Sequence, residues 1–187
     1  MESNTDMGTE KNFCPGRLVV GVLRSRDFSL SPVEKELESR FGPIDYRGPE
    51  LPFSYSSYYD DEMGQGIQRT FYSFERLFDP EELAEAKKNT NKIESGHVLN
   101  PGARRQVNLD PGFLSLGGFI LATTKDRAHR IPLRDGIYAE LTLYYKGGRF
   151  LPLPWTYADW QSPPYLEVLS GLRDRLKAQL KEKKLLG

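Results

Sequence analysis

Charged chemistry is concentrated in one stretch of the chain, Ala122 to Tyr145. Lys125, His129 and Arg130 lie within six positions, and an Arg-Asp-Gly turn separates them from a β-type run whose single acid is Glu140. Lysine and arginine side chains bind anions, whereas histidine and glutamate side chains transfer protons. We therefore expect Lys125 and Arg130 to bind an anionic ligand, and Glu140 and His129 to act as catalytic acid–base groups.

The register of this hairpin decides which of its side chains lie together. A two-residue Asp-Gly turn would place Ile131 opposite Glu140. A three-residue loop, with Gly136 in the left-handed conformation, would place Ile131 opposite Ala139 instead. The second register gathers the apolar residues onto one face, which is what fixes the register of a half-buried sheet, and we prefer it.

The preferred register has consequences for the candidate residues. It pairs Leu133 with Ile137, places Arg130 opposite Glu140 on a polar face, and puts His129 on the apolar face. The polar face would bind the anion. The structural alternative is an ordinary cross-strand ion pair worth ~0.2–1 kcal/mol, with His129 as a hydrogen-bonded structural residue.

Three further motifs supply candidate residues. Glu62 ends a run of three acids, and carboxylates are the ligands that Mg²⁺ or Mn²⁺ favours, so Glu62 and Asp60 are the metal candidates. Asp110, in an Asn-Leu-Asp-Pro-Gly turn, is a third catalytic candidate, and Arg69 is a third ligand-binding candidate. An exposed acidic turn and backbone capping by Asp110 remain the structural alternatives.

The composition excludes several classes of protein. The 187 residues include 26 basic and 26 acidic side chains, and this zero net charge argues against nucleic acid or a membrane surface as a partner. The single Cys14 excludes an intrachain disulfide. No stretch approaches the ~20 apolar residues of a membrane span, and the polar start is unlike a signal peptide. We expect a soluble cytoplasmic protein.

Hydrophobic periodicity and turn residues predict an α+β fold with a mainly antiparallel sheet. The first six elements follow the order β-α-β-β-α-β of a ferredoxin-like unit, which C-terminal hairpins and a final helix extend. We expect residues 1–14 to form a disordered tail and residues 15–187 a single domain. The expected strands are 18–23, 44–57, 68–78, 106–109 and 119–124, and the expected helices are 31–41, 79–93 and 163–183.

Common catalytic motifs are missing from the sequence. It contains no Walker A loop, no GxGxxG after a strand, no GxSxG, no HExxH and no cysteine pair. With two histidines and one cysteine, a structural zinc site is not expected. A nucleotide would therefore bind outside the P-loop architecture.

Seven motifs in a fixed order resemble a known family. The chain contains FSYSSYYDDEMG (53–64), SFERLFDP (73–80), KNTNKIE (88–94), VNLDPGFL (107–114), ATTKDRAHRI (122–131), GIYAELTLYY (136–145) and WTYADW (155–160). This succession resembles a bacterial and archaeal family known as domain of unknown function 4416, over roughly residues 16 to 180. The resemblance implies no activity or ligand, but it implies that the polar motifs belong to one domain. The matched polar positions, without an assigned role, are Glu62, Arg69, Glu75, Asn91, Glu94, Asn108, Asp110, Lys125, His129, Arg130 and Glu140.

These observations lead to two main hypotheses and to a third, RNA binding, which the neutral charge disfavours unless the basic residues segregate on one surface. The first is a polar cleft that binds an anionic small molecule, either a phosphorylated metabolite or a nucleotide, with a divalent metal such as Mg²⁺ as an optional cofactor; hydrolysis or transfer at phosphate would follow from such a site. The alternative is a non-enzymatic protein-interaction module whose polar motifs are structural. A binding site requires Lys125, Arg130, Glu140 and Glu62 to converge in one concave pocket, whereas an interaction module would expose an apolar patch.

Overall fold

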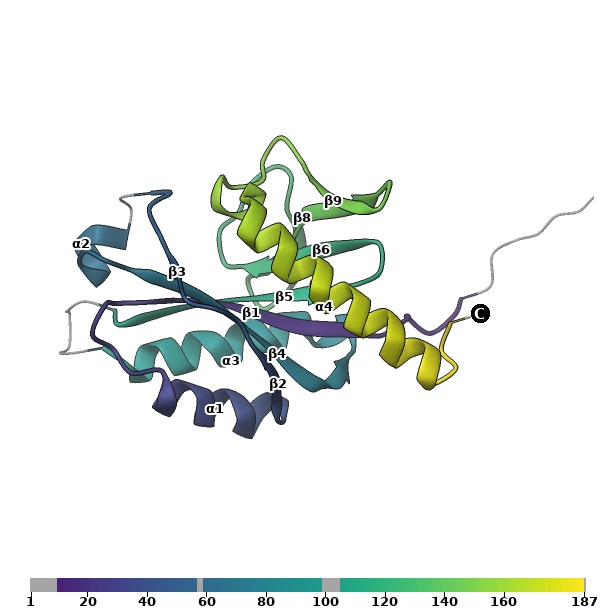
Figure 1. Ribbon diagram of the computed structural model, residues 1–187, viewed down its shortest axis with the longest axis horizontal. Coiled ribbons are helices and arrows are strands. Elements are labelled where there is room, and N and C mark those ends of the chain that lie inside the picture. Colours follow the sequence, from purple (N-terminus) through teal and green to yellow (C-terminus); the bar gives the residue numbers. More distant parts are fainter. Residues whose placement is uncertain (1–9, 57–58, 99–104, 187) are drawn as a thin grey trace, which may run out of the picture.

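The computed structural model describes residues 10–56, 59–98 and 105–186. Within them the chain forms one open sheet with helices on both faces (Figure 1). The strands are β1 (Gly16–Arg24), β2 (Ile44–Arg47), β3 (Leu51–Pro52), β4 (Gln68–Phe78), β5 (Val107–Leu114), β6 (Gly118–Thr123), β7 (Ile131–Arg134), β8 (Ile137–Lys146) and β9 (Arg149–Pro152). The helices are α1 (Ser31–Phe41), α2 (Asp60–Met63), α3 (Leu83–Gly96) and α4 (Pro163–Glu182), with short 3-10 turns η2 (Pro80–Glu82) and η3 (Asp159–Gln161).

The sheet has the strand order β2-β4-β1-β5-β6-β8-β7, with β3 paired to β4 and β9 paired to β8. All of these pairs are antiparallel, which confirms the α+β class and the antiparallel sheet expected from the sequence. The predicted strand at 44–57 is wrong in extent. Among residues 44–56, which the structure describes, only β2 and β3 pair, because Gly48-Pro49 interrupts the run and proline lacks the N–H that a ladder needs.

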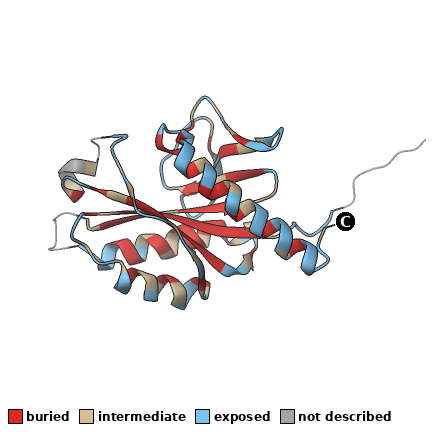
Figure 2. Cartoon of the chain, viewed as in Figure 1, coloured by how far each residue is buried: buried red, intermediate tan, exposed pale blue. Residues whose placement is uncertain are grey.

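Buried residues form two layers on the two faces of the sheet. Central strand β1 is buried on both faces, as its apolar run predicts (Figure 2). Val20 and Val22 belong to the cluster under α1 and α3, whereas Val19 belongs to the cluster under α4. Figure 1 shows α1 and α3 together on one side of the sheet and α4 on the other.

The helices begin and end close to the predicted positions. Asp79 accepts a hydrogen bond from the backbone of Glu81 and forms a capping box with Glu82. The last helix, α4, buries a leucine stripe that includes Leu169, Leu172 and Leu176. No helix in the described part of the chain has the length and apolar character that crossing a membrane requires.

The β7–β8 hairpin has the predicted pairing at one position and a different turn. Ile131 pairs with Ala139 as predicted, but Arg134, not Leu133, pairs with Ile137. The three-residue loop is wrong, because Asp135 and Gly136 both have positive φ, 55° and 75°, as a two-residue type I′ turn requires. An irregularity between Pro132 and Arg134 restores the register further along the strand.

In part of this hairpin the polar face is buried and the apolar face is exposed, the opposite of a simple amphipathic strand. Arg130 and Glu140 are 7% and 1% exposed, whereas Ile131 on the apolar face is 67% exposed. The segment after β9 contacts the polar face, where Nη2 of Arg130 donates to the hydroxyl oxygen of Tyr157 at 3.4 Å. The expectation that the apolar face is the buried one is therefore wrong for Ile131, although Ile137 on the same face is 4% exposed. Paired polar groups occupy the interior on the other face.

Candidate functional site

A pocket opens where β5 and β6 separate. The two strands pair only from Gly112 to Leu114. Alternate residues of a strand direct their backbone nitrogens to the same side, so Leu109, Pro111 and Phe113 all face the β6 side. Pro111 has no N–H to donate, and the ladder ends next to it. Beyond this point the edge of β5 is available to another element.

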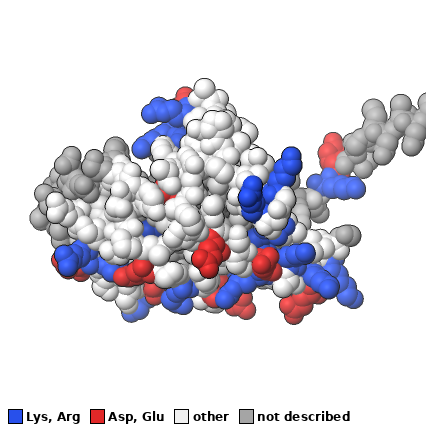
Figure 3. Space-filling model, turned by 45° about the horizontal axis from the view of Figure 1, so that its top comes forward, with Lys and Arg blue, Asp and Glu red and all other residues white. Residues whose placement is uncertain are grey.

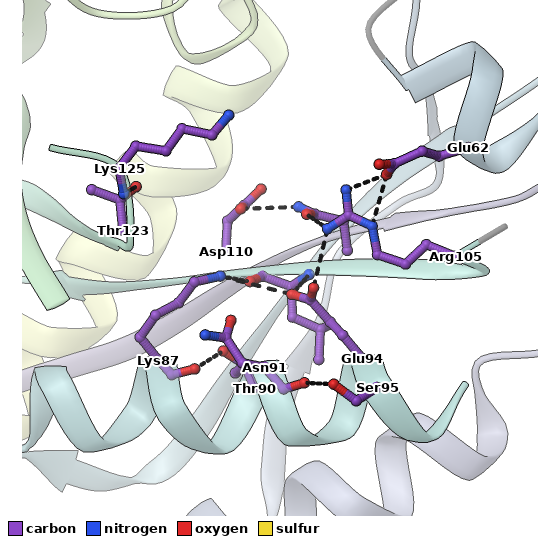
Figure 4. A network of polar contacts seen from close by, with 12 residues as sticks. Glu62, Lys87, Thr90, Asn91, Glu94, Ser95, Arg105, Asp110, Thr123 and Lys125 are labelled. Atoms are coloured by element: carbon purple, nitrogen blue, oxygen red, sulfur yellow. Dashed lines mark hydrogen bonds and ion pairs between the residues drawn. The ribbon is translucent and has the colours of Figure 1, made fainter. Parts of the chain in front are cut away.

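Side chains from α3 take the place of the missing strand. Lys87 donates from Nζ to the carbonyl oxygen of Leu109 at 2.8 Å, and Glu94 accepts from the amide nitrogen of Leu109 at 2.8 Å. Lys87, Asn91 and Glu94 are spaced i, i+4 and i+7, so they share one face of the helix. Figure 4 shows this face beneath β5, with Thr123 and Lys125 approaching from the end of β6.

The pocket has a volume of about 470 Å³, which lies within the range of small-molecule sites. Five basic and four acidic side chains line it, a formal excess of one positive charge. Aromatic rings form another part of its wall. The basic residues are Arg69, Lys87, Arg105, Lys125 and Arg130; the acidic residues are Glu94, Asp110, Glu140 and Asp159; the aromatic residues are Phe53, Tyr55, Tyr59, Tyr157 and Trp160.

Arg69 is buried in the wall of the pocket between two carboxylates. Its Nη1 donates to Asp110 at 3.0 Å and its Nη2 donates to Asp159 at 3.3 Å. The rings of Trp160 and Tyr165 each lie with their centroid 5.7 Å from the guanidinium carbon. Removing this arginine would leave two carboxylates without their cation, so Arg69 primarily fixes the acids in position.

The two carboxylates that contact Arg69 have pKa shifts of opposite direction. Burial acts to raise the pKa of Asp110, but the charges of Arg69 and Lys87 outweigh it and lower the pKa. Burial raises the pKa of Asp159, and Arg69 offsets this only in part. A hydrogen bond contributes to the lower pKa of Asp110, because this carboxylate also accepts from the side-chain amide of Asn108 at 3.0 Å.

Arg105 connects two further acids to the pocket. Its Nε donates to Glu62 at 2.9 Å, and its Nη1 donates to Glu94 at 3.2 Å and to Asn108 at 2.9 Å. Burial raises the pKa of Glu94, against the opposing charge of Lys87. The metal candidate Glu62 thus already has a cationic partner, and the side chain of the second candidate, Asp60, lies outside the described residues. Among the described residues, no group of three His, Cys, Asp or Glu side chains has the arrangement of a metal site.

Arg130, Glu140 and His129 form a group at the β6–β8 side of the pocket. Arg130 donates from Nε to Oε2 of Glu140 at 2.6 Å and from Nη1 to the Lys125 carbonyl oxygen at 2.8 Å. His129 Nε2 lies 3.0 Å from the same Oε2, and its ring stacks on Trp155 at 5.0 Å. The prediction that His129 lies on the apolar face of the hairpin is wrong. Strand β7 begins only at Ile131, so His129 belongs to the preceding turn, and its ring contacts Glu140.

The structure places five of the eight candidate residues in the wall of one pocket: Arg69, Asp110, Lys125, Arg130 and Glu140. The other two described candidates contact residues of this wall: His129 contacts Glu140, and Glu62 accepts from Arg105. Sequence reasoning missed Lys87, Arg105 and Asp159 as site residues. For Lys87 a signal existed in the i, i+4, i+7 spacing of polar residues on α3.

Comparison with known proteins identifies the family. The model of the family described as Domain of unknown function (DUF4416) matches residues 14–176. The chain belongs to this family, as its seven motifs indicate. No curated protein and no solved structure matches the chain.

Proposed function

We propose that the protein binds an anionic small molecule, a phosphorylated metabolite or a nucleotide, in the pocket between α3, β5 and β6. The observation that carries the proposal is the convergence of five basic side chains from separate parts of the chain on one pocket of about 470 Å³. Lysine and arginine side chains usually lie at the protein surface in contact with water. Burying several of these charges around a cavity is unfavourable unless negative charges compensate them. An anion supplies that compensation together with the four acids.

Lys87 is the cation best placed to contact the anion. It is 8% exposed, and within the described part of the chain it donates one hydrogen bond, to Leu109. Its distance of 3.7 Å to Glu94 is longer than a hydrogen bond. Two of the three N–H groups of its ammonium are then available to phosphate oxygens. One turn further along α3 lies Asn91, whose amide has no hydrogen-bond partner among the described residues (Figure 4).

The other candidate cations have supporting roles in the proposal. Lys125 approaches the pocket from the end of β6, opposite α3 (Figure 4). Arg69 and Arg130 contact the ligand only through N–H groups that their carboxylate partners leave available. The aromatic wall, which includes Phe53, Tyr55 and Tyr59, suits a planar group such as a nucleotide base. A divalent metal such as Mg²⁺ would enter with the phosphate, because Mg²⁺ combines few carboxylates with phosphate oxygens.

A thermal-shift and calorimetric screen tests the proposal. Inorganic phosphate, sugar phosphates and nucleotides are added to the purified protein, with and without Mg²⁺. A ligand at ~100 times its dissociation constant stabilises the fold by ~2.7 kcal/mol, which such a screen detects. We expect a phosphorylated compound to bind and Lys87→Met to weaken it at least about tenfold, as loss of a charged hydrogen bond predicts.

The neighbouring lysine offers a matched control. Lys88 lies next to Lys87 but is at the surface, where it contacts Asp135 at 2.8 Å. Lys88→Met should bind the ligand like the wild type. The proposal is wrong if no phosphorylated compound stabilises the wild type, or if Lys87→Met, shown to be folded by circular dichroism, binds with wild-type affinity.

An interaction module remains the second candidate, because one surface feature favours it. Ile131, Leu133 and Leu141 are 67%, 43% and 40% exposed at the β7–β8 hairpin. β7 lies at an edge of the sheet, and exposed apolar edge strands tend to associate. Sedimentation of the wild type and of Ile131→Ser tests this function. If the wild type self-associates and Ile131→Ser does not, the result would support an interaction module. A monomeric wild type would argue against an interaction module that acts by self-association.

We also propose that β1-α1-β2-β4-α3-β5 is a ferredoxin-like unit within the larger sheet. The adjacent order β2-β4-β1-β5, the antiparallel pairing and the position of α1 and α3 on one face support this proposal. Helix α3 and β5, which carry the Lys87 side of the pocket, both belong to this unit.

A further inference from the structure

One oxygen of Glu140 accepts no hydrogen bond from the residues that the structure describes. Among the described residues, Oε1 of Glu140 is the buried side-chain oxygen or nitrogen that lacks one. Glu140 is 1% exposed and lines the pocket. Buried carboxylate oxygens in folded proteins nearly always accept a hydrogen bond, because losing water without compensation is unfavourable. Oε1 is therefore an acceptor that the described side chains leave unused.

The surrounding side chains leave Oε1 without a donor because their own positions are fixed. Arg130 uses its Nε for Oε2, its Nη1 for the Lys125 carbonyl oxygen and its Nη2 for the hydroxyl of Tyr157 at 3.4 Å. Because a carboxylate only accepts, Nε2 of His129 carries the hydrogen in its contact with Oε2. Two donors thus fix Oε2 and orient the carboxylate, while Oε1 accepts from no group in the described part of the chain.

The charges around Glu140 decide which donor fits. Arg130 already lies against this carboxylate, so an ammonium group of a ligand would bring a second positive charge next to a buried guanidinium. A phosphate would be repelled by the carboxylate itself. A neutral hydroxyl group donates a hydrogen bond without adding charge. Glu140 therefore suits a hydroxyl, and the phosphate lies elsewhere in the pocket.

We infer that the ligand is a phosphorylated polyhydroxylated compound, a sugar phosphate or a ribonucleotide, one of whose hydroxyl groups donates to Oε1 of Glu140. This inference rests on the proposed function, in which Lys87 and Asn91 contact the phosphate. It adds a second recognition point from β8, a different element in the lining of the same pocket. Recognition at two points selects hydroxylated phosphate esters over inorganic phosphate and over esters without hydroxyl groups.

Calorimetric titration of matched ligand pairs tests the inference. Glycerol 3-phosphate is compared with propyl phosphate, and adenosine monophosphate with its 2′,3′-dideoxy form. We expect the wild type to prefer the hydroxylated member of at least one pair by about tenfold or more, the usual effect of a hydrogen bond to a charged group. Glu140→Gln keeps the shape but removes the charge, so this preference should shrink while affinity for the ester without hydroxyl groups changes less than about twofold.

A control and a ligand-only comparison make the result decisive. Glu167→Gln, on the exposed side of α4, should keep the wild-type preference. If Glu140→Gln does not fold, the wild-type pairs alone decide the inference. Equal affinity within both pairs, or a preference that persists in folded Glu140→Gln, overturns the inference and leaves the proposed function intact. Failure of the wild type to bind any phosphate compound overturns the proposed function itself.

Discussion

Individual residues of the pocket illustrate how burial and charge oppose each other. Arg69 contacts Asp110 and Asp159, yet the pKa of Asp110 is lowered and that of Asp159 is raised. The second aspartate has a longer contact to the arginine, 3.3 Å against 3.0 Å. At sites of this kind the number of compensating partners, rather than the presence of one salt bridge, decides the direction of the pKa shift.

At the same scale, Glu94 should make stability depend on pH. Burial raises its pKa above the ordinary value of 4.5. The folded state then binds a proton more tightly than the unfolded state, so the contribution of Glu94 is fully present below pH 4.5 and is lost as pH rises through the raised pKa. The free energy of unfolding of the wild type, relative to Glu94→Gln, should therefore decrease between about pH 4 and the neutral range.

Urea unfolding at a series of pH values measures this difference. The Glu94→Gln variant would keep a side-chain oxygen that accepts from the Leu109 amide nitrogen, so the substitution changes the charge more than the shape. A difference that is constant with pH, or that increases as pH rises, would contradict the assigned direction of the Glu94 shift.

At the scale of elements, β1 must pass very close to Arg69. A Cβ atom added at Gly21 would lie 2.9 Å from Nη1 of Arg69 and 3.3 Å from the Trp160 ring. Both neighbours are buried, so they cannot move into solvent. Gly21→Ala should lower the free energy of unfolding by about 1–3 kcal/mol, as overpacking of a core does.

Gly171 in α4 is a control for this prediction, because its surroundings have room for a Cβ atom. It is exposed, and a Cβ atom there would meet nothing within 4 Å. Because alanine favours a helix more than glycine does, Gly171→Ala should raise the free energy of unfolding by about 0.5–1 kcal/mol. Equal effects of the two substitutions in thermal or urea unfolding would show that the close approach at Gly21 is not restrictive.

The pocket exists because strands β5 and β6 pair over only part of their length. Pro111 ends the β5–β6 ladder, and α3 presents Lys87 and Glu94 to the backbone that is left. A regular ladder would fill this space with strand hydrogen bonds. The cleft thus follows from one proline in a strand and one polar stripe on a helix.

At the scale of the whole molecule, the sheet separates two apolar layers. Leu172 of α4 is 1% exposed and belongs to the layer with Val19 and Phe119. Leu172→Ala should reduce the free energy of unfolding by about 2–5 kcal/mol, because it leaves a cavity. Leu133, which is 43% exposed, should tolerate alanine within about 0.5 kcal/mol. Urea unfolding of both variants checks this, and similar losses would contradict the exposed position of Leu133.

The face of the molecule shown in Figure 3 agrees with the neutral composition of the chain. On the face shown in Figure 3, Lys and Arg side chains alternate with Asp and Glu side chains along the lower side. The pocket, in contrast, combines five basic with four acidic residues in a small volume. Charged groups are thus mixed on this face and also line the cleft, as the proposed ligand site needs.

The sequence by itself determined the α+β class, the buried central strand, the α4 helix and the contact between Arg130 and Glu140. Each depends on local information: apolar runs, caps, turn residues and the two-residue period of a strand. Only the tertiary structure decided that Arg130 and Glu140 face the interior, and that Lys87 and Asp159 reach the same pocket. A residue's own periodicity predicts which side of an element it occupies, but what covers that side depends on segments distant in the chain.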